Sequence, residues 1–133
     1  MRLNVTTPTN GTDQAARIDE FEVYGSSSGV TNLALNKPAT ADSSCNANEG
    51  PAKAVNGSVT GGNSDKWCSG GASKWLQVDL GASHSISSFT VRHAGAGGET
   101  ASWDTRDYDL QVSADGSTWT TVVQARGNTA DVT

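Results

Sequence analysis

The chain has little of what several functional classes require. It contains two cysteines, two histidines and few aromatic residues, and its 14 acidic residues against 9 basic ones give a net charge of −5. Phosphate binding depends on clustered Lys and Arg, so this composition argues against a nucleic-acid partner. The cysteines form no Cys-x-x-Cys pair and only two histidines accompany them, so there is no zinc-binding motif.

Long apolar segments are also missing. No apolar run approaches the ~18–20 residues of a membrane span, and polar sequence follows Met1, with no signal-peptide pattern. The absent signal does not establish a cytoplasmic origin, because a domain cut from a larger secreted protein also lacks one. Cys45 and Cys68 lie 23 residues apart in a loop-rich chain. They form either one disulfide, which implies a secreted protein, or two reduced thiols.

Hydrophobic residues alternate with polar ones in several short segments, which is typical of half-buried strands. The predicted strands cover residues 1–7, 17–24, 74–80, 85–93, 108–113 and 118–125. Gly-rich and Asp-Gly turns separate them, and no longer window has a helical period, so the pattern predicts an antiparallel sandwich or barrel. A slip in the alternation at Asp19 and Glu20 predicts a β-bulge. Trp75 and Trp119 lie within strand patterns and are predicted core residues.

Six stretches together carry a family resemblance. They are residues 32–40 (NLALNKPAT), 53–57 (KAVNG), 65–67 (DKW), 74–81 (KWLQVDLG), 108–119 (YDLQVSADGSTW) and 17–25 (RIDEFEVYG). The set resembles the discoidin-like, or coagulation factor V and VIII C-type, family, which includes the family 32 carbohydrate-binding modules. The resemblance implies an all-β, jelly-roll-like antiparallel β-sandwich of the galactose-binding-like type, with binding loops gathered at one end.

The stretches follow the family order only if the N-terminal one is moved to the end. We therefore interpret residues 1–133 as one circularly permuted β-sandwich domain. Residues 1–25 are then the ancestral C-terminal segment, residues 26–29 a joining linker, and residues 30–133 the ancestral N-terminal and middle segment. The other interpretation is a slice through a tandem array, in which residues 1–25 complete a different domain. Either arrangement allows a monomer or a swapped dimer.

The resemblance also implies a structural calcium site. Carried over by position, its ligands are the carbonyls of Lys53, Ser58 and Asp19, the side chains of Asn56 and Asp65, and the carboxylate of Glu20. Calcium takes about six to eight oxygens, which this set supplies. The family usually has Asp where this chain has Asn56, so binding is weakened unless Asp65 compensates. The alternative is a solvated polar loop without a metal.

Candidate carbohydrate ligands lie in three loops. A sugar is bound by an aromatic face together with planar polar groups that pair with hydroxyls. The resemblance places residues 8–17, 42–49 and 93–106 at one end of the sandwich. The candidates in them are His93, Glu99, Trp103, Arg106, Asn48, Glu49 and Asn10. Each also has a structural alternative, such as an Arg106–Asp107 ion pair or a Trp103 side chain packed under its loop.

These observations predict a non-catalytic carbohydrate-binding module that recognises a poly- or oligosaccharide, secreted as part of a larger protein. No motif supports an enzyme, because no nucleophile elbow, nucleotide fingerprint or supported carboxylate pair is present. The candidate loops lack exposed Leu, Phe or Met, which argues against membrane insertion. The alternatives are a cell-surface or protein adhesion domain and an engineered permuted or assembling scaffold.

Overall fold

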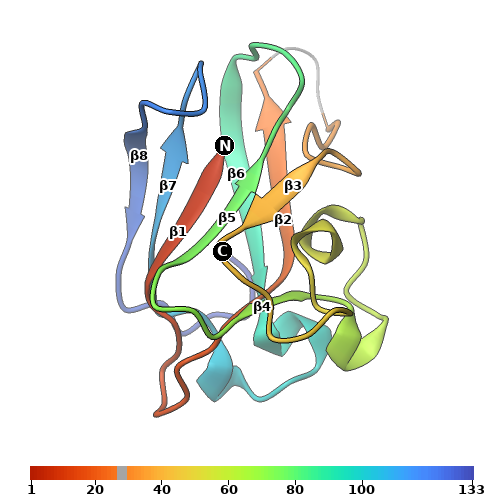
Figure 1. Cartoon of the computed structure of the whole chain (residues 1–133), viewed down its shortest axis with the longest axis vertical. Coiled ribbons are helices and arrows are strands. Elements are labelled where there is room, and N and C mark those ends of the chain that lie inside the picture. Colours follow the sequence, from red (N-terminus) through yellow and green to blue (C-terminus); the bar gives the residue numbers. More distant parts are fainter. Residues whose placement is uncertain (27–29) are drawn as a thin grey trace.

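The computed structural model describes residues 1–26 and 30–133, and most of the segment interpreted as a joining linker, residues 27–29, lies outside the described residues. Two antiparallel sheets face each other (Figure 1). One has five strands in the order β3-β5-β1-β7-β8 and the other has three in the order β4-β2-β6. The strands are β1 (Arg2–Thr7), β2 (Ala16–Gly25), β3 (Ala39–Ala41), β4 (Trp67–Ser69), β5 (Lys74–Val78), β6 (Ile86–His93), β7 (Asp107–Val112) and β8 (Thr120–Ala125).

Helical structure in the described residues is limited to short 3-10 turns. These are η1 (Pro51–Val55), η2 (Gly62–Ser64), η3 (Ala94–Gly97) and η4 (Ala101–Trp103). The predicted all-β sandwich is therefore confirmed. None of the helices that the structure describes is long and apolar enough to cross a membrane.

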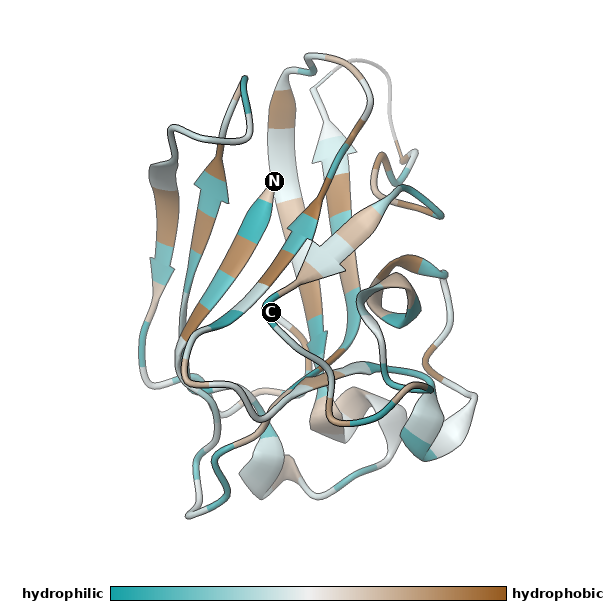
Figure 2. Ribbon diagram, in the orientation of Figure 1, coloured by the Kyte–Doolittle hydropathy of each residue, from teal (hydrophilic) through white to brown (hydrophobic). Residues whose placement is uncertain are grey.

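The first 25 residues supply a central strand to each sheet. β1 lies between β5 and β7, and β2 lies between β4 and β6. Alternation explains their burial: Leu3 and Val5 of β1 are buried, whereas Arg2 and Asn4 are only partly so. The same alternation appears as hydrophilic and hydrophobic bands along β1 in Figure 2. Phe21 and Val23 of β2 are fully buried in the same hydrophobic core. The N-terminal segment and the rest of the chain thus share one core.

The predicted bulge is confirmed in β2. Its pairing with β6 shifts register between Ile18 and Glu20, so one extra residue, Asp19, is accommodated there. Asp19 and Glu20 are both buried as a result. The bulge therefore places two consecutive carboxylates inside the protein.

Two tryptophans lie elsewhere than predicted. Trp75 and Trp119 are half-buried rather than core residues, and Trp119 precedes β8 instead of lying in it. The guanidinium of Arg2 lies 4.9 Å from the Trp75 ring centroid and 4.2 Å from that of Trp119. The alternation was correct for β5, but Trp75 occupies its outward-facing set, where a cation covers the aromatic surface.

The predicted disulfide is present between Cys45 and Cys68. The two segments that it joins are also paired through their backbones, since Cys45 N donates to Cys68 O (2.8 Å) and Cys68 N donates to Glu49 O (3.1 Å). Next to the bridge, Trp67 is fully buried and its Nε1 donates to the carbonyl of Ser43 (3.0 Å). The loop of residues 42–49 is therefore anchored to β4.

Candidate functional site

The three loops named from the sequence meet at one end of the sandwich, below β4 in Figure 1. Asn10 N donates to Ser102 O (3.0 Å), which joins the β1–β2 loop to the β6–β7 loop. Asn10 Nδ2 adds bonds to the carbonyls of Asp104 (3.2 Å) and Asn128 (2.9 Å). The amide donors of Asn10 are thus used to hold the loops together.

The half-exposed aromatic ring of Trp103 lies at this loop end of the sandwich. Trp103 closes η4, and the Arg17 guanidinium lies 4.2 Å from its ring centroid. Arg17 also donates to both carboxylate oxygens of Asp13 (2.9 and 3.2 Å) and lies 3.7 Å from Glu99. A cation held by two carboxylates therefore supports the ring from one side, which restricts its rotamers.

A buried lysine extends the network toward the disulfide. The Lys66 side chain is 3% exposed, and its Nζ lies 3.1 Å from Glu99 Oε1 and 3.3 Å from Glu49 Oε1. It also donates to the carbonyl of Asn63. Alternating charges thus run from Asp13 through Arg17, Glu99 and Lys66 to Glu49 (this set is called the charge relay below). Such a network restricts the positions of these polar side chains.

His93 does not face the surface. It is fully buried, its ring centroid is 5.5 Å from that of Tyr108, and its Nε2 lies 3.0 Å from Thr133 Oγ1. Burial lowers the pKa of His93 to about 4, so the ring is neutral near pH 7. The expectation that His93 pairs with a sugar hydroxyl is corrected, because a ligand on the loops does not reach its ring in this structure.

The remaining candidates divide into two groups. Glu49, Glu99 and Trp103 are brought together by the charge relay. Arg106 is outside it, with its Nε 3.9 Å from Asp107 Oδ1, as the structural alternative predicted. Asn48 is exposed, its backbone N–H donates to Asn46 Oδ1 (2.9 Å), and its side-chain amide forms no hydrogen bond with the described residues.

Sequence reasoning missed three members of the charge relay, Asp13, Arg17 and Lys66. The strand pattern identified Arg17 only as the start of a strand, and the motif around Trp67 gave Lys66 no role of its own. Asp13 and Arg17 are four residues apart, but Arg17 and Lys66 meet Glu99 only through contacts that are distant along the chain, which no local pattern identifies. The pairing is visible only when the loops are placed side by side.

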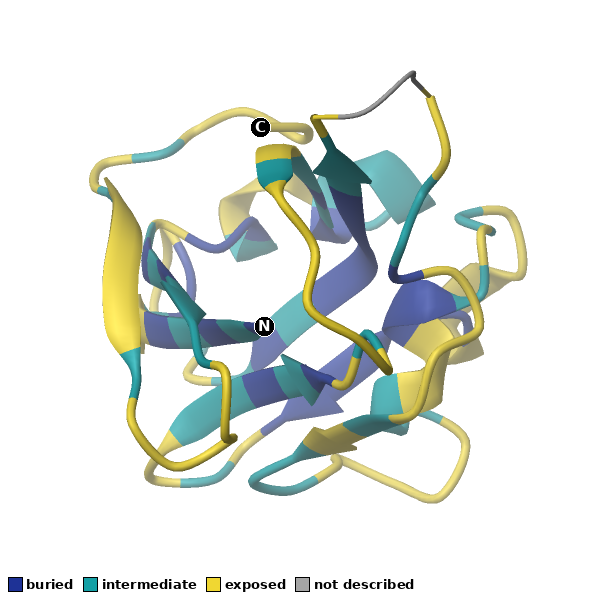
Figure 3. Ribbon diagram, turned by 90° about the horizontal axis from the view of Figure 1, so that it is seen from above, coloured by how far each residue is buried: buried dark blue, intermediate teal, exposed yellow. Residues whose placement is uncertain are grey.

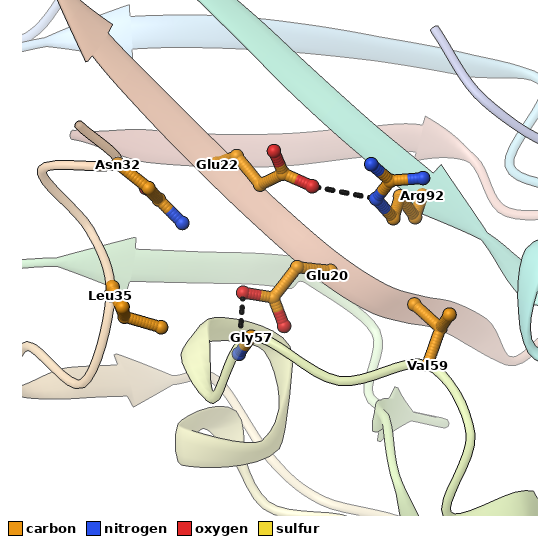
Figure 4. Close-up of a pocket in the computed structure, with 7 residues that line it drawn as sticks. All are labelled: Glu20, Glu22, Asn32, Leu35, Gly57, Val59 and Arg92. Carbon is orange, nitrogen blue, oxygen red and sulfur yellow. Dashed lines mark hydrogen bonds and ion pairs between the residues drawn. The ribbon is translucent and has the colours of Figure 1, made fainter. Parts of the chain in front are cut away.

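One of the predicted calcium ligands, Glu20, lines a pocket of about 410 Å³ beside β2 (Figure 4). Glu20 Oε1 accepts a hydrogen bond from Gly57 N (3.0 Å). Glu20 Oε2 is buried and has no hydrogen-bond partner among the described residues. Burial raises the pKa of Glu20 to about 7. A buried carboxylate oxygen without a donor is destabilised as an anion unless a cation or a proton accompanies it.

The loop next to this carboxylate is rich in oxygen atoms. Asp65 accepts hydrogen bonds from Asn56 Nδ2 (2.7 Å), Ser58 Oγ (2.6 Å) and Gly61 N (2.9 Å). Lys53 lies in η1, whose C-terminal cap is Asn56. The carboxyl group of Asp19 points elsewhere, since a Cβ on Gly97 would lie 2.2 Å from its Oδ1. Only the backbone carbonyl of Asp19 is therefore left for the predicted site.

The fold places the chain in the class of all-β sandwich domains, with ordered polar loops around one aromatic ring at one end. Within that class, the chain belongs to the F5/F8 type C family: a family model described as a NedA-like, galactose-binding domain matches residues 53–133, more than half of the chain. Domains of this family are typically non-catalytic binding modules. No curated protein and no solved structure matches the chain.

Proposed function

We propose that the protein is a non-catalytic carbohydrate-binding module whose ligand contacts the loop end of the sandwich. The observation that carries this proposal is Trp103, a half-exposed ring bordered by the charge relay. The exposed part of the Trp103 ring offers an apolar face to a sugar, and the partly exposed carboxylates of Glu49 and Glu99, whose side chains are 13% and 11% exposed, are acceptors for its hydroxyl groups. The family match and the disulfide support a secreted module that binds a galactose-like sugar.

The first test is substitution of the ring. Trp103→Ala is expected to weaken glycan binding roughly five- to thirtyfold, because stacking on an aromatic surface contributes about 1–2 kcal/mol. Binding is measured by calorimetry with the sugar class found in a glycan array. Trp119→Ala is the matched control, because Trp119 is equally half-buried but precedes β8 at the other end of the sandwich.

The two variants separate the possible outcomes. Loss of affinity in Trp103→Ala alone supports the loop site. Equal affinity of both variants and the wild type removes Trp103 from the site. Loss in Trp119→Ala alone places the ligand on the sheet face instead.

We also propose that residues 1–25 are the ancestral C-terminal segment of a permuted domain. Support comes from the central positions of β1 and β2 in the two sheets and from the shared core. A strand from an unrelated domain has no reason to match the register and alternation of its neighbours on both sides. The family model matches residues 53–133, so the match does not test whether residues 1–25 are the ancestral C-terminal segment.

A structural calcium ion is the third part of the proposal. The unpartnered Glu20 oxygen supports it, with Asn56, Ser58 and Asp65 supplying further oxygens nearby. When bound, calcium would neutralise the buried carboxylate and tie β2 to the η1 loop. After chelation, we expect millimolar calcium to raise the midpoint of thermal unfolding by several degrees, since a ligand that binds only the folded state stabilises it.

Glu20→Gln tests the assignment of the ligand. The substitution keeps the side-chain shape and the acceptor for Gly57 N but removes the charge, so the calcium-dependent rise should disappear. Magnesium serves as the ion control, because it demands a smaller octahedral site. A rise that persists in Glu20→Gln would remove Glu20 from the ligands, and no rise in the wild type would contradict the calcium site altogether.

A further inference from the structure

A patch of partly exposed side chains lies on the outer face of the five-stranded sheet. In the strand pairing, Arg2 of β1 is opposite Gln77 of β5 on one side and Gln111 of β7 on the other. Leu3, the next residue of β1, is buried in the core, so these three side chains lie on the other face of the sheet. Because each of the three is partly exposed, a ligand can reach this face.

Two tryptophan rings hold the Arg2 side chain on this face. The guanidinium lies 4.9 Å from the ring centroid of Trp75, in β5, and 4.2 Å from that of Trp119. Trp119 precedes β8, the exposed strand at the left edge of the view from above (Figure 3). Both rings are half-buried, so each keeps exposed surface next to a cation whose position is restricted. The three residues Trp75, Arg2 and Trp119 are called the arginine clip below.

The positive charge of Arg2 has no carboxylate partner. Every other arginine of the chain forms an ion pair with Asp or Glu, whereas Arg2 forms none within the part of the chain that the structure describes. Its Nη2 donates to Gln77 Oε1 (2.9 Å), and its Nε is buried without a partner among the described residues. Burial lowers the pKa of Arg2, because part of the charge is removed from water. An anion at the exposed part of the guanidinium would compensate this charge.

The neighbouring side chains define the chemistry of the ligand further. The amide groups of Gln77 and Gln111 flank Arg2, and Gln111 Nε2 donates to Thr121 Oγ1 (3.2 Å). Planar amides pair with hydroxyl groups, and an indole ring packs on the apolar face of a sugar ring. One cation on a chain of net charge −5 suits a ligand with widely spaced negative charges and not a dense polyanion. Sugars that carry a carboxylate combine these properties.

We propose that the arginine clip binds an acidic polysaccharide, a chain of sugar rings in which carboxylate groups recur. A carboxylate of the ligand pairs with the Arg2 guanidinium, and the neighbouring sugar rings pack on the exposed parts of Trp75 and Trp119. Hydroxyl groups of the ligand pair with the amides beside Arg2. This inference is independent of the carbohydrate site at the loop end, because the arginine clip shares no residue with the charge relay or with Trp103.

The test measures the binding of trigalacturonate to the full chain by calorimetry, without added calcium. The matched control ligand is the methyl ester of the same trisaccharide, which keeps the sugar rings and hydroxyl groups but carries no negative charge. We expect saturable binding of the acid, roughly tenfold or more tighter than that of the ester, and weaker at high salt because ions screen the charges. Equal binding of the acid and the ester, or no binding of either, would overturn the proposal.

Substitution of Arg2 locates the binding. Arg2→Gln should weaken binding of the acid by roughly tenfold and remove its preference over the ester, because the cation is lost. Arg2→Lys keeps the charge and should retain part of the preference. Arg126→Gln is the control, since the Arg126 side chain is 48% exposed but already pairs with Asp109 of β7 (2.7 Å). Unchanged binding in Arg2→Gln would overturn the assignment.

Two further measurements distinguish other sites and other ligands. Trp103→Ala should leave the binding of trigalacturonate unchanged, because Trp103 lies at the loop end and outside the arginine clip. A loss of this binding in Trp103→Ala but not in Arg2→Gln would assign the acidic sugar to the loop end and overturn the proposal. Equally tight binding of a triglutamate peptide would show that the arginine clip recognises carboxylates without selecting sugars, which also overturns it.

Discussion

Lys66→Met is expected to lower the free energy of unfolding by about 3–5 kcal/mol, the largest effect of any single substitution proposed for this protein. Met keeps the length of the buried side chain but removes the ammonium group that lies between Glu49 and Glu99. Both carboxylates are mostly buried, so Glu49 would be left without a cationic partner and Glu99 would keep only Arg17, 3.7 Å away. Burial already raises the pKa of the neighbouring Asp19 to about 7, with Glu99 adding to the rise and Lys66 opposing it.

Urea unfolding of the wild type and the variant measures this effect. Lys37→Met is the matched control, because Lys37 is exposed and forms no ion pair within the described part of the chain. Adding Glu99→Gln to Lys66→Met should restore part of the loss, since it removes one of the stranded charges. A Lys66→Met variant as stable as the Lys37→Met control would show that the buried ion pairs do not stabilise the loop end.

Replacing both Cys45 and Cys68 with Ala is expected to lower stability by about 3 kcal/mol. The bridge closes a loop with a sequence separation of 23 residues, and opening it restores the conformational entropy of the unfolded chain. The same change frees the segment that carries Glu49, so the ordering of the charge relay should weaken. Calorimetry of the double variant, and of the wild type with and without reductant, gives the measurement.

Comparing the reduced wild type with the double variant separates the effect of losing the disulfide bond from the effect of losing the cysteine side chains. Reduction of the wild type should reproduce most of the loss seen in the double variant, because both remove the same cross-link. If native protein yields two reactive thiols on titration, the disulfide is absent in solution and the prediction is wrong. A loss in the double variant without any loss on reduction would assign the effect to packing of the sulfur atoms.

Several features of the fold followed from local sequence pattern. Alternation located six of the eight strands, and the slip at Asp19 and Glu20 marked the bulge in β2. β3 and β4 were missed because each has three residues, too few to show a period. These short strands form because β5 and β2 offer edges for them to pair with.

The error on His93 was avoidable from the sequence. His93 lies two residues after Val91 in β6, and the alternation that places Val91 inside places His93 on the same face. The polar character of the ring, next to a glycine-rich loop, led to the opposite interpretation. Trp75 shows the reverse case, since its hydrophobicity predicted burial while its place in the alternation predicted the outer face.

The sequence by itself therefore determined the positions of six of the eight strands, the candidate disulfide and the family, because alternation and motif spacing are properties of residues close together along the chain. Only the tertiary structure decided which charges meet at the loop end and that His93 is buried. Lys66 and Glu99 are 33 residues apart in sequence but 3.1 Å apart in space. Electrostatic contacts depend on such distances in space, and folding alone sets them.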